Sequence, residues 1–309
     1  MPAHQHAFEA QQSAVPYWEN PAEFNVTAIG SCRILGPLRH ALADDCYKLN
    51  QSGVYGYCHS SAEAVQQLKV LQGDTELPEH LLPLTSPKHA ENLNARRAHV
   101  TSDLYVVELS SAKILTIDSV CIQLNYFTRH FASFFADRER SRAYWRAVRE
   151  DDHAERCAVL DSGPQLKPAD RYLLDQLKLR LSSHEDLVCD ITEVQERVPN
   201  VLFVTHFDAK KHDGALLVAR QAYLQSVRAA LRKTDAIFFD PSDYVEAFGQ
   251  SEALDDPNGS LTHYSEAFEQ FLGQNWRSRY IEPLYEEQLK KVDRTKHFQN
   301  VRNSVAAFG

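Results

Sequence analysis

Residues 25–42 read NVTAIGSCRILGPLRHAL and join a strand-like apolar run to an amphipathic helix through Gly30, Ser31 and Cys32. The apolar run predicts a strand over 24–29. The apolar residues that follow recur at helical spacing and predict a helix over about 35–43. Pro37 is tolerated in the first turn of a helix, so it places the helix start nearby. A strand that passes directly into a helix is the repeating unit of α/β proteins.

The rest of the chain alternates between predicted strands and helices. Further strands are expected over 103–109, 201–205 and 236–239, and a short one within 44–60. Helices are expected over 62–71, 168–182, 183–198, 216–232 and 265–273, with a mostly helical stretch over 119–150 and a charged helical tail over about 280–295. This alternation predicts an α/β fold with a doubly wound parallel sheet flanked by helices.

The chain of 309 residues is long enough for one large α/β domain. We expect an N-terminal arm over 1–23, the α/β domain over 24–275 and a C-terminal helical tail over 276–309. Helical insertions are expected within the domain. One covers 74–98, which is polar and contains proline, and the other covers 119–198.

Charge and hydropathy restrict the class of partner. The net charge of −9 disfavours a nucleic acid or an anionic membrane, because both require a basic face. No run of 18 apolar residues occurs and the start of the chain lacks a signal-peptide pattern, so we expect no membrane span and a cytoplasmic location. The basic run RERSRAYWRAVR, 138–149, is interpreted as a solvated helix face, with a site for an anionic ligand as the alternative.

Six cysteines occur, and none forms a C-x-x-C pair. In a chain of this length without a secretion signal, they are expected to be reduced thiols. Their spacing argues against a structural zinc site, and we expect no metal.

Polar residues follow each of the predicted strands, where ligands bind in doubly wound sheets. They are Ser31 and Cys32, then Ser110 and Ser111, then Thr205, His206 and Asp208, and finally Asp240, Ser242 and Asp243. A serine hydroxyl at a helix N-terminus faces unpaired amide groups, which could stabilise an oxyanion. Serine is also a common helix N-cap. Cys32 is either a nucleophile activated by the same helix end or a small buried side chain.

The Gly30-Ser31-Cys32 seam resembles the nucleophile motif of the SGNH/GDSL hydrolases, closest to their GSCFA-type branch, which begins with Gly-Ser-Cys. FFDPSDYVEAF, 238–248, and LTHYSEAFEQFLG, 261–273, look like later blocks of that branch. The seam also bears a distant resemblance to capsular polysaccharide biosynthesis proteins. The resemblance covers roughly residues 24–273 and implies an SGNH/flavodoxin-like fold.

The resemblance also implies catalytic roles. Ser31 would be the nucleophile and His263 its base, in a serine-dependent acyl-ester hydrolase or O-acyltransferase. Position 260 holds serine where the family has an aspartate, so Asp255 or Asp256 would orient His263, or a dyad would act alone.

Oxyanion and substrate contacts are expected from the seam and the ends of the neighbouring strands. The candidates are the amide of Ser31 itself and Gly30, Cys32, Arg33, Ser110, Ser111 and His206. The expected substrate is an acylated carbohydrate or similar small ester. No cofactor is expected, although acetyl-CoA or another acyl-CoA could be the donor.

Two alternatives stay open. The first is a non-catalytic binding or assembly protein on the same fold, and the second is an acyl-transfer enzyme that depends on Cys32. A homo-oligomer is also left open.

Overall fold

The computed structural model describes residues 23–43, 46–86, 99–211, 213–257 and 261–291. The predicted arm over 1–23 lies almost wholly outside these residues, as do much of 74–98 and the end of the predicted tail. None of the helices in the described ranges is both long enough and apolar enough to cross a membrane.

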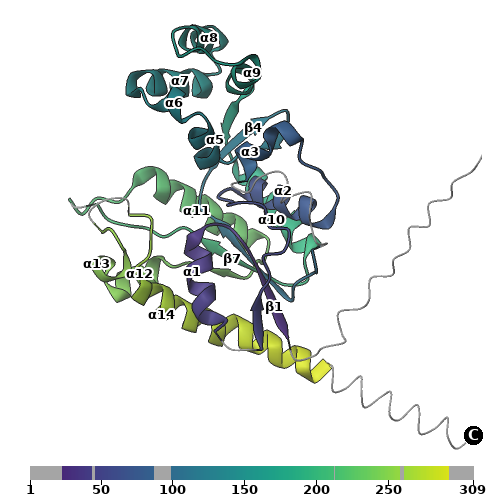
Figure 1. The fold of residues 1–309 in the computed structure, drawn as a ribbon. Helices are drawn as coiled ribbons and strands as arrows, with labels where there is room; N and C mark the ends of the chain where they lie inside the picture. Colours follow the sequence, from purple (N-terminus) through teal and green to yellow (C-terminus); the bar gives the residue numbers. More distant parts are fainter. Residues whose placement is uncertain (1–22, 44–45, 87–98, 212, 258–260, 292–309) are drawn as a thin grey trace, which may run out of the picture.

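The centre of the molecule is a five-stranded parallel sheet (Figure 1), which confirms the predicted α/β class with helices on both faces of the sheet. Its strand order is β2-β1-β3-β7-β8. The strands are β1 (Phe24–Ile29), β2 (Tyr47–Leu49), β3 (Leu104–Leu109), β7 (Val201–Thr205) and β8 (Phe238–Phe239). The direction of strand succession reverses between β1 and β3, so the carboxyl ends of these two strands form the switch point where such sheets bind ligands.

One face of the sheet is covered by α1 (Cys32–Ala41), α12 (Ser242–Phe248), α13 (Gln250–Ala253) and α14 (Glu266–Trp276). After α14 the chain continues through the π-helical turn η3 (Arg277–Ile281). The other face is covered by α2 (Ser61–Gln72), α10 (His184–Arg197) and α11 (Val218–Lys233). The two faces bury separate hydrophobic clusters, as expected when apolar strands are covered on both sides.

A third hydrophobic cluster belongs to the stretch between β3 and α10, which we call the insertion (residues 113–181). It contains a small antiparallel sheet of order β5-β4-β6, formed by β4 (Lys113–Ile117), β5 (Val120–Cys121) and β6 (Lys178–Leu181). Its helices are α5 (Leu124–His130), α6 (Ala132–Phe135), α7 (Arg138–Glu150), α8 (His153–Asp161) and α9 (Pro168–Gln176). Two short turns that precede β3, η2 (Glu79–Leu81) and α3 (Leu82–Thr85), also pack on this cluster.

Several element boundaries differ from the prediction. The small antiparallel sheet was not expected, and β6 replaces the end of the helix predicted over 168–182, because Lys178–Leu181 pairs with β4. The helix α10, expected inside the insertion, packs instead on the main sheet. The strand predicted over 236–239 shortens to two residues.

The first helix also begins earlier than predicted, at Cys32. Pro37 therefore lies in its second turn rather than its first, where proline leaves the carbonyl of Arg33 without its intrahelical partner. The prediction failed because it placed the helix start from Pro37 rather than from the Ser31 cap.

Helices α1 and α14 approach closely through two glycines. A Cβ atom added at Gly273 would lie 2.5 Å from the Pro37 carbonyl oxygen and 3.0 Å from the Ala41 nitrogen. At Gly36, by contrast, the nearest atoms all belong to the carboxyl group of Glu269, the far end of a flexible side chain. The close approach holds α14, and the loop that precedes it, against the first helix.

Gly273→Ala is expected to lower the free energy of unfolding by about 1–3 kcal/mol, because backbone atoms cannot move aside to admit the methyl group. Chemical denaturation of both variants measures the effect, with Gly36→Ala as the matched control. The control should lose much less, since the Glu269 carboxyl group can swing away. Equal losses in the two variants would contradict this account.

Candidate active site

The seam between β1 and α1 lies at the switch point of the sheet. Ser31 is the N-cap of α1, and its side-chain oxygen accepts a hydrogen bond of 3.4 Å from the amide of Arg33. Its own amide donates to Glu108 Oε2 at 2.6 Å, and the residue is only 5% exposed. This amide is therefore engaged by a buried carboxylate, and its role in an oxyanion hole stays a prediction.

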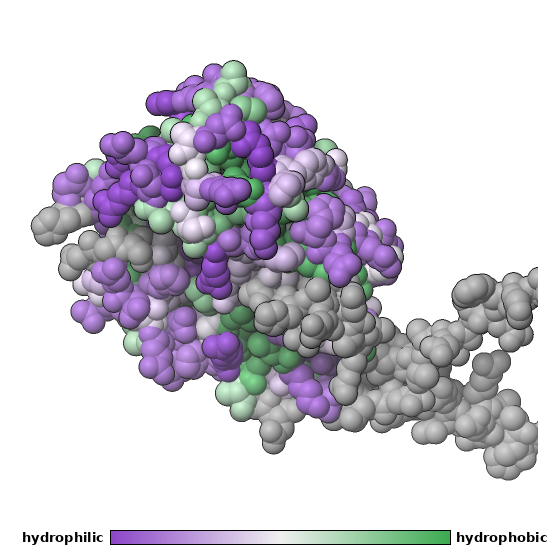
Figure 2. All heavy atoms as spheres, turned by 45° about the horizontal axis from the view of Figure 1, so that its top comes forward, coloured by the Kyte–Doolittle hydropathy of each residue, from purple (hydrophilic) through white to green (hydrophobic). Residues whose placement is uncertain are grey.

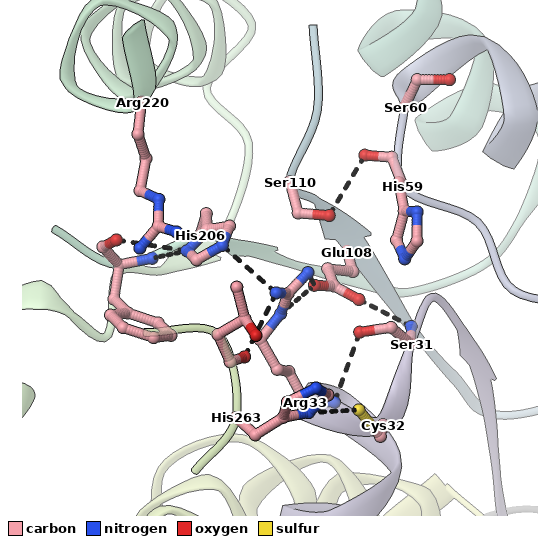
Figure 3. Close-up of polar contacts among 12 residues, drawn as sticks. Ser31, Cys32, Arg33, His59, Ser60, Glu108, Ser110, His206, Arg220 and His263 are labelled. Carbon is pink, nitrogen blue, oxygen red and sulfur yellow. Dashed lines mark hydrogen bonds and ion pairs between the residues drawn. The ribbon is translucent and has the colours of Figure 1, made fainter. Parts of the chain in front are cut away.

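Glu108 is the residue that the sequence analysis missed. It stands near the carboxyl end of β3, is 1% exposed, and binds Arg33 through Nε at 2.7 Å and Nη2 at 2.5 Å (Figure 3). Burial alone would raise the pKa of Glu108, but the Arg33 charge, His59 and the hydrogen bonds from Ser31 and Arg33 hold it below its ordinary value. The signal available in the sequence was an acidic residue within an otherwise apolar strand.

Gly30 is required by this arrangement. A Cβ atom at position 30 would lie 2.5 Å from the Glu108 Cβ and 2.7 Å from the Ile34 Cδ1. Gly30 is one of the residues predicted to contact the oxyanion or the substrate. In the structure, the group that approaches it is the Glu108 side chain.

His206 lies next to Arg33 and makes a polar contact with its guanidinium group. Its Nε2 lies 3.2 Å from Arg33 Nη1, and its Nδ1 accepts a hydrogen bond of 2.7 Å from the Phe207 amide. Burial, then the charges of Arg33 and Arg220, lower the pKa of His206 well below its ordinary value. Both ring nitrogens of His206 are in polar contacts, and its role as an oxyanion donor stays a prediction.

Two arginines hold the loop that carries His263. Arg220 donates to the Leu261 carbonyl at 3.1 Å, and Arg33 donates to the Thr262 carbonyl at 3.4 Å. Leu261 has a φ of 49°, a strained conformation for a leucine, which the surrounding contacts must maintain. The His263 carbonyl accepts from the Asp255 amide at 3.1 Å.

These contacts place His263 over Cys32. The Cys32 Sγ lies 3.4 Å from His263 Nδ1, across the mouth of the seam (Figure 3). Within the described residues, no hydrogen bond joins the Ser31 hydroxyl to His263. The structure therefore brings together two of the predicted site residues, Cys32 and His263, whereas the hydroxyl of Ser31 faces the helix end that it caps.

The surroundings of Cys32 favour the protonated form of its thiol. Burial raises its pKa, the charges of Glu108 and Glu269 add to the effect, and the Arg33 charge opposes it. The thiol can therefore donate its proton to His263 Nδ1 in the hydrogen bond, and the amide of Cys32 stands at the positive end of α1.

The remaining candidates lie around this pair. The amides of Ser110 and Ser111 both donate to the His59 carbonyl, at 2.8 and 2.9 Å, so they hold the loop before α2. A role of either serine as an oxyanion donor stays a prediction. The Asp255 contact with His263 is through the backbone. An orienting role for the carboxylate of Asp255 or Asp256 stays a prediction.

The fold and the site define an α/β protein with a thiol–imidazole pair at the helix that follows its first strand. The chain belongs to the TviD N-terminal domain family, which it matches over residues 24–279. It is also 31% identical over 250 residues to a protein of Salmonella typhi described as Vi polysaccharide biosynthesis protein TviD. That match covers 79% of this chain but only 30% of the relative.

The predicted resemblance to polysaccharide biosynthesis proteins agrees with these comparisons. Neither description names the SGNH or GSCFA groups, so that part of the resemblance enters only the proposal below.

Breaking the buried ion pair between Arg33 and Glu108 should destabilise the protein. Glu108→Gln leaves the Arg33 charge buried without a counter-charge, which typically lowers the free energy of unfolding by about 3–5 kcal/mol. Adding Arg33→Met removes that charge, so the double variant should be more stable than Glu108→Gln alone. Urea denaturation of the single and double variants measures both, and a double variant less stable than either single one would contradict the assignment.

The raised pKa of Cys32 predicts its reactivity. Alkylation by iodoacetamide requires the thiolate, so its rate should rise with a midpoint above that of a free thiol, about pH 8.5. Glu269→Gln removes one charge that raises the pKa and should move the midpoint down. Peptide mass spectrometry follows Cys32, with the exposed Cys189 as evidence that the reagent is active. A midpoint below that of a free thiol would contradict the prediction.

Proposed function

We propose that this protein is an acyl-transfer enzyme of polysaccharide biosynthesis, in which Cys32 is the nucleophile and His263 its base. The observation that supports this most is the distance of 3.4 Å between the Cys32 Sγ and His263 Nδ1 at the switch point of the sheet. It favours the cysteine-dependent form over the serine-dependent form that the sequence resemblance implies. The family and the relative's description support the link with polysaccharides.

The chemistry would run through a thioester. Cys32 Sγ attacks the carbonyl carbon of the acyl donor while His263 Nδ1 takes the thiol proton. The oxyanion develops beside the amide of Cys32, at the positive end of α1. His263 then gives its proton to the departing oxygen or sulfur of the donor, and the acyl group stays on Cys32.

The second half restores the enzyme. His263 removes a proton from an acceptor hydroxyl, which attacks the thioester carbonyl, and the C–S bond breaks as the proton returns to Cys32. A sugar hydroxyl as acceptor gives an O-acyltransferase, and water gives an esterase. An acyl-CoA donor fits the same steps.

The test is turnover of p-nitrophenyl acetate, with and without acetyl-CoA and sugar acceptors. Cys32→Ala and His263→Ala should each lower kcat/KM by about 10²–10⁴-fold, because each removes a partner in proton transfer or bond formation. Ser31→Ala should lose its cap, about 1 kcal/mol of stability, and a hydrogen bond to Cys32 that lowers the thiol pKa, but it keeps the proposed nucleophile and base. Cys189→Ala is the control for loss of a thiol elsewhere.

Trapped acyl-enzyme provides a second measurement. Mass spectrometry after brief exposure to the ester should find the acyl group on the peptide that contains Cys32. Loss of activity in Ser31→Ala, with Cys32→Ala active, would place the nucleophile at Ser31. A wild-type chain that is neither active nor acylated would favour the non-catalytic binding protein.

A further inference from the structure

Three side chains of the kinds that bind metal ions meet in the insertion, outside the seam. His153 and Cys157 belong to α8, and Asp175 belongs to α9, one residue before its end. We call these three residues the insertion cluster. Helices α8 and α9 are in contact and lie at the outer end of the insertion (Figure 1). Figure 2 turns the insertion toward the viewer, and its visible surface is largely hydrophilic with small hydrophobic patches.

The three ligand atoms are spaced as one metal ion requires. His153 Nε2 lies 3.4 Å from Asp175 Oδ1 and 3.7 Å from Cys157 Sγ, and Sγ lies 4.0 Å from Oδ1. The circle through three points at these spacings has a radius of roughly 2.2 Å, and zinc bonds measure about 2.0 Å to nitrogen or oxygen and about 2.3 Å to sulfur. An ion near the centre of that circle therefore reaches all three atoms at bonding distance.

The local structure of α8 places two of the ligands on one face. Asp152 caps the helix by accepting a hydrogen bond of 2.9 Å from the Glu155 amide, so His153 is the first helical residue. Cys157 follows four residues later, and residues at that spacing are neighbours on a helix surface. The sequence analysis predicted no metal from the spacing of the cysteines. It missed Asp175, which lies 18 residues after Cys157 and is brought there only by the fold.

The third ligand is held in place by its neighbours. Gln176 Nε2 donates to Asp175 Oδ2 at 3.1 Å, which leaves Oδ1 directed at the other two ligands. Arg156 is 4% exposed and donates through Nη1 to the carbonyls of Asp175 and Leu177, so it fixes the end of α9 against α8. The charge of Arg156 is countered by Asp151, whose Oδ1 lies 3.6 Å from Nη2. Outer hydrogen bonds of this kind orient metal ligands.

We propose that the insertion cluster binds a zinc ion through His153, Cys157 and Asp175, with water in the fourth position. The ion would tie α8 to the end of α9. A thiolate beside an imidazole selects zinc over magnesium and calcium, which take oxygen ligands. The Cys157 thiol gives its proton to solvent as the sulfur–zinc bond forms. The His153 side chain is 72% exposed, so the ion and its water can reach the cluster from solvent.

The experiment uses the full chain carrying Cys32→Ala as the parent. Cys32 and His263 form another thiol–imidazole pair, and the substitution removes it as a competing site. The parent is stripped of metal with a chelator and titrated with Co²⁺, whose thiolate complexes absorb in the near-ultraviolet and whose tetrahedral complexes absorb strongly in the visible. We expect a single equivalent of Co²⁺ to produce both bands, and Zn²⁺ to displace it and remove them.

Variants of the cluster should weaken binding in proportion to their place in it. Cys157→Ser should abolish the thiolate band and weaken Zn²⁺ binding by about 100-fold or more, because it removes the sulfur ligand. Asp175→Asn should weaken binding by about tenfold or more, since a carboxylate charge is lost. Gln176→Ala removes only the hydrogen bond that orients Asp175 and should weaken binding by about tenfold.

The matched control is His130→Gln. His130 forms a similar partly exposed pair with Asp170 in the same insertion, with 3.9 Å between His130 Nε2 and Asp170 Oδ1, and no thiol of the described chain completes a metal cluster with that pair. This variant should bind Zn²⁺ as the parent does. Thermal melts without metal check that each variant is folded, and Zn²⁺ should raise the Tm of the parent but not of Cys157→Ser.

Several outcomes would overturn the proposal. These are a parent that shows no thiolate band, a band that survives in Cys157→Ser, and an equal loss of binding in His130→Gln. A band that appears only when Cys32 is restored would place the ion at the seam and would overturn it as well. The inference does not depend on the proposed acyl transfer, because the parent lacks the proposed nucleophile.

Discussion

The buried ion pair between Arg33 and Glu108 is the interaction on which the site depends. It joins the first turn of α1 to the end of β3, across the switch point of the sheet. Removing two charges from water is costly, so such a pair is stable only when its other hydrogen-bonding positions are also satisfied. Here they are satisfied by the Ser31 amide, by His206 and by the Thr262 carbonyl. Gly30 lets β1 pass close enough to Glu108 for the pair to form.

The same pair also holds the loop that carries His263. Arg33 contacts both Glu108 and the carbonyl of Thr262, which immediately precedes His263 in the chain. Arg220 holds the carbonyl before that, at a leucine with a left-handed backbone. Two arginines, one of them held by the Glu108 carboxylate, thus fix the backbone just before His263.

The sequence predicted the parts of the structure that depend on local pattern. The strands of the main sheet are apolar runs, and the strands over 24–29 and 201–205 fall at the predicted residues. The prediction failed where contacts between residues far apart in the sequence determine the structure. The segment Lys178–Leu181 has no strong strand pattern of its own and becomes a strand because β4 lies beside it. Glu108 was missed for a similar reason, since nothing within β3 shows that Arg33 stands opposite. His263 was predicted from the resemblance, because LTHYSEAFEQFLG, 261–273, looks like the histidine-bearing final segment of that family.

The geometry also explains why the thiol, and not the hydroxyl beside it, faces the base. Ser31 is the cap, so its oxygen turns back to the Arg33 amide and its own amide is taken by Glu108. Cys32 is the first residue inside the helix, and one step along a helix turns the side chain by about 100°. That step turns the side chain from the sheet toward α14 and the loop that carries His263. Ser31 therefore fixes the N-terminus of α1, and Cys32 lies at the positive end of the helix dipole. A nucleophile placed one residue after the cap has the positive helix end, an amide donor and the base within reach, while the buried ion pair stays intact.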